Sequence, residues 1–543
     1  MKLQIAIFAA IFCSSGASAQ FPIHSVTNGS QTAQILGSSI ANVGDIDLDG
    51  ANDLIIGAPG SKRLGSIFPE GAVELISGAD GTRIWARYGF TQGDAFGTAV
   101  AGGFDVNGDG IPEIAVGAPL YDNLITDDGA VYILEGTTKK VLRVLFGLPT
   151  AGALYGSHVE TIGDINDDGE LDFLIGAPNT SFLAGAEGYV QVISGKDLGT
   201  IRTHRGANLF DLFGRGLAGL PDVDLDGFPD YAIGIPGFDA GGINRGAVDI
   251  YSGYDGSRLK RLKGKIDQSQ FGTTMCATHD PDQPNSARLF VGSPDDSQVG
   301  NFGGRVEVIS LCEFSTVKVL SPNSSFDRLG ASLANGGDLN GDGIDDVLVG
   351  STGDDFAGPN AGSVTVLSGT TLTSIARYYG VLGSAFGKSV CGLGDVNKDG
   401  IDDFAIGSWN PGASVLEGNV TIRSYLGVDQ LPVPPSVLGL EWFPGSKLGN
   451  SRQSDGGLLA TDIPGSRCVI RASLAVPGAT GPIYNDPLTT FFREFFLMPA
   501  SGSRLFPIDL LQPSMAGITL TMQVVRWPLL NQLSPAYDIL FGG

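Results

Sequence analysis

Residues 96–119 read FGTAVAGGFDVNGDGIPEIAVGAP, and this stretch decides the fold. It joins an aromatic–Gly pair, an acidic loop and an apolar run that closes in Gly-Ala-Pro. A Phe-Gly pair or a close relative recurs seven times, at steps of 60, 59, 58, 58, 58 and 57 residues. A near-constant period of this size is typical of propellers and solenoids. The seven pairs are Leu36-Gly37, Phe96-Gly97, Tyr155-Gly156, Phe213-Gly214, Phe271-Gly272, Leu329-Gly330 and Phe386-Gly387.

Each repeat predicts four short β-strands and no helix. The aromatic–Gly pair precedes a short apolar strand, the acidic loop leads into the Gly-Ala-Pro strand, and two further strands follow. Four strands with Gly-rich turns describe one propeller blade. The last repeat lacks a fourth strand, while residues 22–27 form an unassigned strand at the other end of the chain. We therefore expect an all-β, seven-bladed β-propeller whose last blade is closed by this N-terminal strand.

The chain divides into four predicted parts. Residues 1–19 form a signal peptide, residues 20–428 the propeller, residues 429–436 a Pro-rich linker and residues 437–543 a C-terminal β domain. This last part lacks the repeat, and its apolar runs are separated by Pro and Gly, which indicates a small β-sandwich. Its very apolar segment 491–497 reads as core, or alternatively as a docking surface.

The N-terminal segment predicts where the protein acts, and the net charge limits the classes of partner. One Lys, an apolar run and the small residues Ala17, Ser18 and Ala19 predict export and cleavage near Ala19. No other stretch reaches the length of a membrane span. We therefore expect a secreted or cell-surface protein. A net charge of −25 argues against a nucleic-acid partner and points to cations.

Six of the seven repeats carry the loop D-x-[DN]-x-D-G-x-x-[DE] between their first two strands. Oxygen-bearing side chains at positions 1, 3 and 5 converge when the loop curls, and Gly at position 6 permits the sharp turn. Position 7 can add a backbone carbonyl, and position 9 a further carboxylate. Because calcium takes six to eight oxygen ligands, it is the cation that fits best. The alternative is a set of acidic turns that bind nothing, but such turns would repel strongly without a cation.

We therefore predict about six structural calcium ions. The predicted ligands are Asp45, Asp47, Asp49, Ala51 and Asp53; Asp105, Asn107, Asp109, Ile111 and Glu113; Asp164, Asn166, Asp168, Glu170 and Asp172; Asp222, Asp224, Asp226, Phe228 and Asp230; Asp338, Asn340, Asp342, Ile344 and Asp346; and Asp395, Asn397, Asp399, Ile401 and Asp403. The fifth repeat reads HDPDQPN at residues 279–285 and lacks the Gly, so we expect no calcium there.

The order of aromatic–Gly pair, calcium loop and Gly-Ala-Pro turn resembles the FG-GAP repeat of integrin alpha-subunit propellers and their bacterial secreted relatives. The resemblance covers roughly residues 21–428. It implies a seven-bladed propeller with its calcium loops on one face and ligand binding on the opposite face or at the central opening. In integrins this propeller works together with a second subunit.

The loops after the Gly-Ala-Pro turns each contain an aromatic residue. A ring of aromatics at the mouth of the propeller would suit a sugar or the cationic side chain of a partner. The alternative is that each aromatic packs under its own loop. These residues are Phe68, Tyr121, Phe182, Phe238, Phe302, Phe356 and Trp409.

Two functions remain open after this reading. The first is a secreted, calcium-binding adhesion or ligand-binding protein with a protein or glycan ligand. The second is an extracellular carbohydrate-active enzyme, a polysaccharide lyase or hydrolase, whose active site would lie in the central opening. The sequence contains neither G-x-S-x-G nor H-E-x-x-H, so we expect a protein that is not an enzyme. Cys276, Cys312, Cys391 and Cys468 show no CxxC spacing, and both disulfides and buried thiols remain open.

Overall fold

The structure is a computed structural model, and it describes residues 34–181, 186–239, 241–278, 287–409 and 418–425. In the rest of the chain it describes only the backbone of seven short strands. The chain separates into two compact units. One comprises residues 22–425, and the other comprises residues 1–21 together with residues 426–543.

Residues 22–425 form seven antiparallel sheets of four strands each. The first three blades contain β3 (Ser39–Gly44), β4 (Asp53–Ala58), β5 (Ala72–Ile76) and β6 (Arg83–Tyr88); β7 (Val100–Phe104), β8 (Glu113–Ala118), β9 (Ala130–Leu134) and β10 (Val141–Phe146); and β11 (His158–Thr161), β12 (Phe173–Ala177), β13 (Tyr189–Ile193) and β14 (Thr200–Arg205). The next three contain β15 (Leu217–Leu220), β16 (Asp230–Ile235), β17 (Ala247–Tyr251) and β18 (Arg258–Lys263); β19 (Thr274–Thr278), β20 (Arg288–Gly292), β21 (Val306–Ser310) and β22 (Ser315–Leu320); and β23 (Leu329–Gly337), β24 (Asp346–Ser351), β25 (Ser363–Leu367) and β26 (Ser374–Tyr379). The seventh contains β27 (Ser389–Gly394), β28 (Asp403–Ser408), β29 (Asn419–Ser424) and β2 (His24–Val26).

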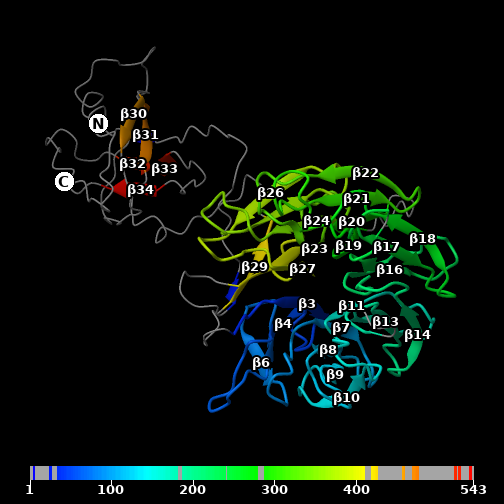
Figure 1. Ribbon diagram of the computed structural model, residues 1–543. Coiled ribbons are helices and arrows are strands. Elements are labelled where there is room, and N and C mark those ends of the chain that lie inside the picture. Colours follow the sequence, from blue (N-terminus) through cyan, green and yellow to red (C-terminus); the bar gives the residue numbers. More distant parts are fainter. Residues whose placement is uncertain are drawn as a thin grey trace. The chain divides into compact units, whose positions relative to one another are not determined.

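The seven sheets stand around a ring, as Figure 1 shows. The first strand of each blade is the innermost, and each contacts the first strands of both neighbouring blades, with β27 returning to β3. The predicted seven-bladed propeller with four strands per blade is therefore confirmed. Among the described residues all regular structure is β-strand, and no helix there is long and apolar enough to cross a membrane.

The N-terminal strand closes the ring. Strand β2 pairs antiparallel with β29, with His24 opposite Ile422 and Val26 opposite Val420. The last blade thus combines strands from the two ends of the propeller segment, as the unassigned strand at residues 22–27 predicts. A bridge between Leu36 and Gly418 adds a second link at this junction.

The repeated glycines are needed because adjacent blades approach each other backbone to backbone. A Cβ added to Gly117, in the Gly-Ala-Pro turn of the second blade, would lie 1.9 Å from the carbonyl oxygen of Gly156 in the third. Gly156 itself has a φ of 84°, which favours glycine. The aromatic–Gly and Gly-Ala-Pro motifs therefore form one contact between neighbouring blades.

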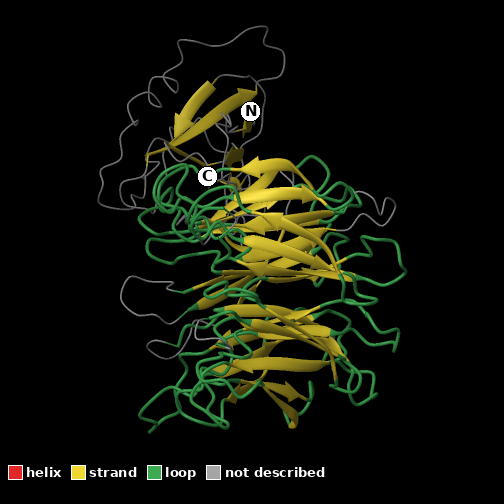
Figure 2. Ribbon diagram, turned by 45° about the vertical axis from the view of Figure 1, so that its right-hand side comes forward, coloured by secondary structure: helices red, strands yellow, loops and turns green. Residues whose placement is uncertain are grey.

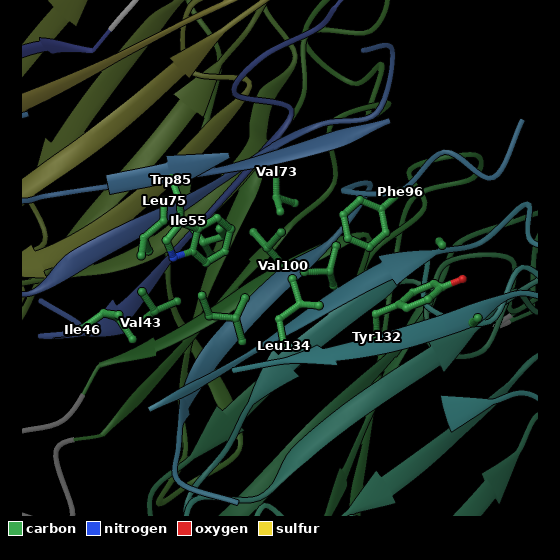
Figure 3. Close-up of a cluster of buried hydrophobic side chains, with 14 residues drawn as sticks. Val43, Ile46, Ile55, Val73, Leu75, Trp85, Phe96, Val100, Tyr132 and Leu134 are labelled. Atoms are coloured by element: carbon green, nitrogen blue, oxygen red, sulfur yellow. The ribbon is translucent and has the colours of Figure 1, made fainter. Parts of the chain in front are cut away.

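Seven clusters of buried apolar side chains hold the ring together, and each is shared by two adjacent blades. Figure 3 shows the cluster between the first two blades, where Trp85 and Leu75 face Phe96 and Tyr132. The Trp85 indole donates a hydrogen bond of 2.7 Å to the Gly136 carbonyl in the next blade. Burial between blades, rather than within one blade, thus supplies most of the apolar core.

The strand order gives the propeller two distinct faces, and Figure 2 shows loops at both ends of its strands. The acidic loops join first to second strands, and the third-to-fourth turns lie on the same face. The loops after the Gly-Ala-Pro turns and the blade-to-blade connections lie on the opposite face. We call these the acidic-loop face and the opposite face.

The second unit contains one six-stranded sheet. It consists of β30 (Asp455–Leu458), β31 (Arg467–Ala475), β1 (Gln4–Ala6), β32 (Thr519–Met522), β34 (Tyr537–Leu540) and β33 (Val524–Trp527), the last of which pairs with β31. The predicted sandwich requires a second sheet, which is not among the strands described, so it stays a prediction. The predicted signal peptide and linker and the alternatives for residues 491–497 also stay predictions. Cys276, Cys312 and Cys391 are free thiols, and the side chain of Cys468 lies outside the described residues.

Candidate metal loops and the opposite face

All six predicted loops adopt one geometry, in which the first Asp closes the turn. In the first blade, Asp45 accepts hydrogen bonds from the backbone N–H groups of Asp49, at 3.0 Å, and Gly50, at 2.8 Å. The corresponding Asp residues of the other five loops accept the same two kinds of bond. The glycine at position 6 has a positive φ in every loop, as the motif predicts.

The position 9 carboxylate is fully buried and joins the loop to the third strand. Asp53 accepts bonds from the N–H groups of Ile46, at 2.9 Å, and Gly78, at 3.2 Å. Burial raises the pKa of Asp53, Asp172 and Asp230 to about 6, and the pKa of Glu113, Asp346 and Asp403 to about 7. The cause is desolvation, which penalises the charged form, with neighbouring loop carboxylates adding to it.

In three loops the structure brings three carboxylates close enough to share one ion. Their ligand oxygens lie within 4.8 Å of one another in the groups Asp45, Asp47 and Asp53; Asp105, Asp109 and Glu113; and Asp222, Asp224 and Asp230. In the loops with Asn at position 3, the Asn amide donates to the position 9 carboxylate, as from Asn340 to Asp346 at 2.9 Å. The Asn side chain therefore also points into the loop.

The donor set fits a hard cation. The six loops contribute 20 carboxylates, and none of them takes part in an ion pair within the described part of the chain. Carboxylates gathered without a protein cation repel one another and favour a bound divalent ion. The residue at position 7 donates its N–H to the position 5 carboxylate, as from Ala51 to Asp49 at 2.9 Å, and the same holds in the other five loops. Ligation by its carbonyl stays a prediction.

Two features of these loops escaped the sequence reasoning. A hydroxyl beyond the loop orients the position 5 carboxylate, as when Ser77 donates to Asp49 at 3.2 Å. Ser194, Ser252, Thr370 and Ser424 do the same for their loops. In the first, third and fourth blades, the Ser-Gly pair at the end of the third strand was the available signal. In addition, position 4 is left-handed even where it is Leu48 or Leu225, at a φ of 62° in each.

The fifth repeat cannot be compared with the others, because residues 279–286 lie outside the described residues. The absence of a metal site in that repeat therefore stays a prediction.

Because of the position 9 carboxylates, the free energy of unfolding should depend on pH with opposite signs in the calcium-free and the calcium-bound protein. In calcium-free protein their pKa is higher folded than unfolded, so the folded state binds more protons between pH ~4 and ~7. The free energy of unfolding should therefore decrease as the pH rises through this window. With calcium in excess it should increase, because an ion binds the deprotonated form. Thermal unfolding at several pH values, with and without calcium, measures both trends. Parallel trends would contradict calcium binding by the position 9 carboxylates.

The aromatic residues predicted for the opposite face differ in their exposure. Phe68 and Phe356 are 63% and 64% exposed, and Phe302 and Trp409 are 44% and 37% exposed. Tyr121 packs against Tyr132 and Phe146, and Phe238 is partly buried beneath Arg261. Phe182 lies outside the described residues. The described aromatics thus divide into those that pack beneath their own blade and those that face solvent.

Most of the exposed large apolar side chains of the described residues lie on the opposite face. They are Leu64, Ile67, Phe68, Phe90, Leu120, Leu124, Ile125, Leu209, Phe210, Ile243, Val299, Phe302, Phe326, Phe356, Val381, Leu382 and Trp409. The acidic-loop face exposes only Leu48, Leu171, Leu225 and Tyr254 among the residues that the structure describes. A concentration of exposed apolar side chains on one face is typical of an interaction site.

Comparison with known proteins agrees with this architecture. The FG-GAP repeat family matches residues 96–134 and 329–367. Integrin alpha-PS5 of Drosophila melanogaster is 34% identical over 166 residues, which are 28% of this chain and 16% of that protein. Integrin alpha-4 of Xenopus laevis is 28% identical over 220 residues, which are 38% and 20% of the two chains. Human integrin alpha-11 is 31% identical over 181 residues, 31% of this chain and 15% of that protein.

The matched segments span a fifth or less of these integrin alpha subunits. Among solved structures, a chain from the complex of BBS1N with ARL6DN superimposes with a TM-score of 0.48 and 9% identity, over 76% of this chain and 99% of that chain. The chain therefore carries FG-GAP repeats on a seven-bladed β-propeller and has integrin alpha subunits among its homologues.

Proposed function

We propose that this protein is a secreted, calcium-stabilised β-propeller that acts outside the cell in adhesion or ligand binding. The observation that carries the proposal is the set of six acidic loops on one face combined with the apolar surface of the other. The integrin alpha homologues support an adhesive role, and the predicted N-terminal signal peptide supports export.

Calcium is the ion that we propose for the six loops, with a structural role. The side chains at positions 1, 3, 5 and 9 would hold it, as in Asp45, Asp47, Asp49 and Asp53. A bound ion supplies positive charge that offsets the crowded carboxylates. Because the position 9 carboxylate is bonded to the third strand, holding the loop also fixes the connection between the first three strands of the blade.

The opposite face is the proposed ligand face. Its loops differ between blades while the sheets beneath them repeat, which is the usual arrangement for recognition on a repeat scaffold. Trp409 is the proposed anchor, because its indole is partly exposed and lies 4.6 Å from the Lys388 ammonium. Phe356 and Phe68 are more exposed and would widen this contact area.

A second candidate is the extracellular polysaccharide lyase or hydrolase, because ionisable side chains do gather in the central opening. His158 lies there near Arg215 and Lys388. Burial and these two cations lower the pKa of His158 to about 3, which makes it a weak general base at neutral pH. Glu160, also on β11, is an exposed carboxylate two residues further along the same innermost strand. Incubation with polygalacturonate, followed by assay of released reducing ends, tests this candidate, and any turnover lost in Glu160→Gln would favour it.

The ligand face is tested with a ligand identified by screening the exported protein, in excess calcium, against glycans and extracellular proteins. Trp409→Ala should weaken binding of that ligand by about tenfold or more, the loss typical of an interface hot spot. The matched control is Tyr254→Ala, because Tyr254 is 62% exposed on the acidic-loop face. Both variants should keep the calcium-dependent unfolding curve. Equal affinity of Trp409→Ala and wild type, repeated in Phe356→Ala and Phe68→Ala, would mean that these aromatics only pack their own loops.

A further inference from the structure

The mouth of the central opening on the opposite face gathers positive charge. Arg215 and Lys388 each directly follow the glycine of an aromatic–Gly pair, and Arg328 directly precedes another pair. The aromatic–Gly pairs occupy equivalent places around the ring, each just before or at the start of an innermost strand. The backbones of Arg215, Arg328 and Lys388 therefore lie at the same end of three innermost strands. Lys388 interacts electrostatically with both arginines, so the three residues belong to one cluster.

In the described part of the chain, the protein pairs only one of these three cations with a carboxylate. Within the described residues, Arg215 and Lys388 form no ion pair, and Arg328 pairs with Asp295 at 3.5 Å. The charges acting on Lys388 and on His158 are all cationic. Desolvation and the two arginines also lower the pKa of Lys388, as expected for a cation that lacks a carboxylate partner. In a chain of net charge −25, such a site is a local exception.

A buried nitrogen in the same cluster also lacks a partner. Ser39, Ser332 and Ser389 lie near the start of innermost strands and each donate a hydroxyl hydrogen bond to the carbonyl of the aromatic–Gly glycine in a neighbouring blade, at 3.1, 2.8 and 2.7 Å. His158 occupies this place in the third blade, opposite Gly176 as Ser39 is opposite Gly57. Its Nδ1 is buried and has no hydrogen-bond partner. The third blade thus presents an unpartnered polar atom where the first, sixth and seventh blades have a hydrogen-bonded hydroxyl.

The rim around this cluster, formed by the blade-to-blade connections that lead into it, carries exposed aliphatic and aromatic side chains. Leu209 and Phe210 are exposed before Arg215, Phe326 before Arg328, and Leu382 before Lys388. Aliphatic and aromatic side chains together suit the core of a protein–protein contact. A sugar platform would use stacked aromatics with polar neighbours instead. The rim therefore favours a polypeptide over a glycan as the occupant of this face.

We propose that the partner of the opposite face is a protein that inserts an acidic side chain into the mouth of the central opening, between Arg215, Arg328 and Lys388. The carboxylate would offset the three cations, while apolar residues beside it would cover the rim. This inference rests on the proposed function, since it names the chemistry of the ligand that the face binds.

A labelled hexaglutamate peptide is the probe, with fluorescence anisotropy measured at low salt in excess calcium. Wild-type protein should bind hexaglutamate and should not bind hexaglutamine or hexalysine. Arg215→Gln and Lys388→Gln should each weaken binding by about tenfold, because each removes one of the three cations that would face the acidic side chain. The control is Lys263→Gln, which removes the same charge from the exposed outermost strand β18 and should leave binding unchanged. Unchanged midpoints of thermal unfolding would show that all three variants fold.

Three outcomes would overturn the inference. The first is equal weakening by Lys263→Gln, which would mean a diffuse charge effect. The second is wild-type affinity for hexaglutamate in both Arg215→Gln and Lys388→Gln. The third is tighter binding of trigalacturonate with the same dependence on Arg215 and Lys388, which would identify an acidic glycan. If a screened ligand still depends on Trp409 while hexaglutamate fails to bind, only the acidic-partner inference is lost and the proposed function stands.

Discussion

Removing calcium is expected to lower the thermal unfolding midpoint of the propeller more than any single side-chain change in its loops. A ligand that binds only the folded state at a concentration about tenfold above its dissociation constant adds about 1.4 kcal/mol per site. Six independent sites would therefore add about 8 kcal/mol, comparable to the whole stability of an ordinary domain. Scanning calorimetry of the exported protein, with calcium and after dialysis against a chelator, measures this effect.

The number of ions distinguishes specific loops from general screening of negative charge. Calorimetric titration with elemental analysis should give about six calcium ions per chain. Asp395→Ala should remove one ion and part of the calcium-dependent stability. The control Glu313→Ala removes a carboxylate from the third-to-fourth turn of the fifth blade, on the same face, and should remove neither. Binding of two ions or fewer, or identical unfolding curves with and without calcium, would refute the assignment.

Replacing Gly117 by Ala is expected to be one of the most damaging single-methyl changes in the propeller. Its added Cβ would lie 1.9 Å from the Gly156 carbonyl oxygen, and a backbone atom cannot turn away as a flexible side chain can. Two blades would have to separate at a junction that also holds one of the buried apolar clusters. We expect a loss of about 3 kcal/mol or more in the free energy of unfolding, measured by urea unfolding in excess calcium.

Gly65→Ala is the matched control for this experiment. Gly65 has a φ of 91° and open space around it, so an added methyl group there costs only backbone strain. That cost should be about 1 kcal/mol. Gly117 is not among the positive-φ glycines, so its substitution tests close approach alone. If Gly117→Ala is no more damaging than Gly65→Ala, the aromatic–Gly and Gly-Ala-Pro contact does not determine blade spacing.

The fold was predictable because the residues that specify each blade lie close together within one repeat. Near-identical spacing of seven aromatic–Gly pairs gave the number of blades, and the missing fourth strand of the last repeat predicted closure by the N-terminal strand. The acidic loops were equally accessible. Their ligands lie within nine consecutive residues, so the side chains of Asp45 and Asp53 converge wherever the loop curls.

The opposite face was predictable only in part. Sequence placed an aromatic residue in each of its loops, but Tyr121 packs against its own blade whereas Phe356 is exposed. Exposure depends on what the neighbouring strand supplies: Tyr132 and Phe146 flank Tyr121, while Phe356 stacks on the edge residue Tyr379. Such contacts vary from blade to blade and follow no repeat rule.

By itself, the sequence determined the seven blades, the closure of the ring and the composition of the six acidic loops, because these depend on residues close together in a repeating unit. Only the tertiary structure brought Arg215, Arg328 and Lys388 to one mouth and left the Nδ1 atom of His158 beside them without a hydrogen-bond partner. These residues come from four blades and lie up to 230 positions apart. Closure of the ring places them together, since every innermost strand begins at the same level around one axis.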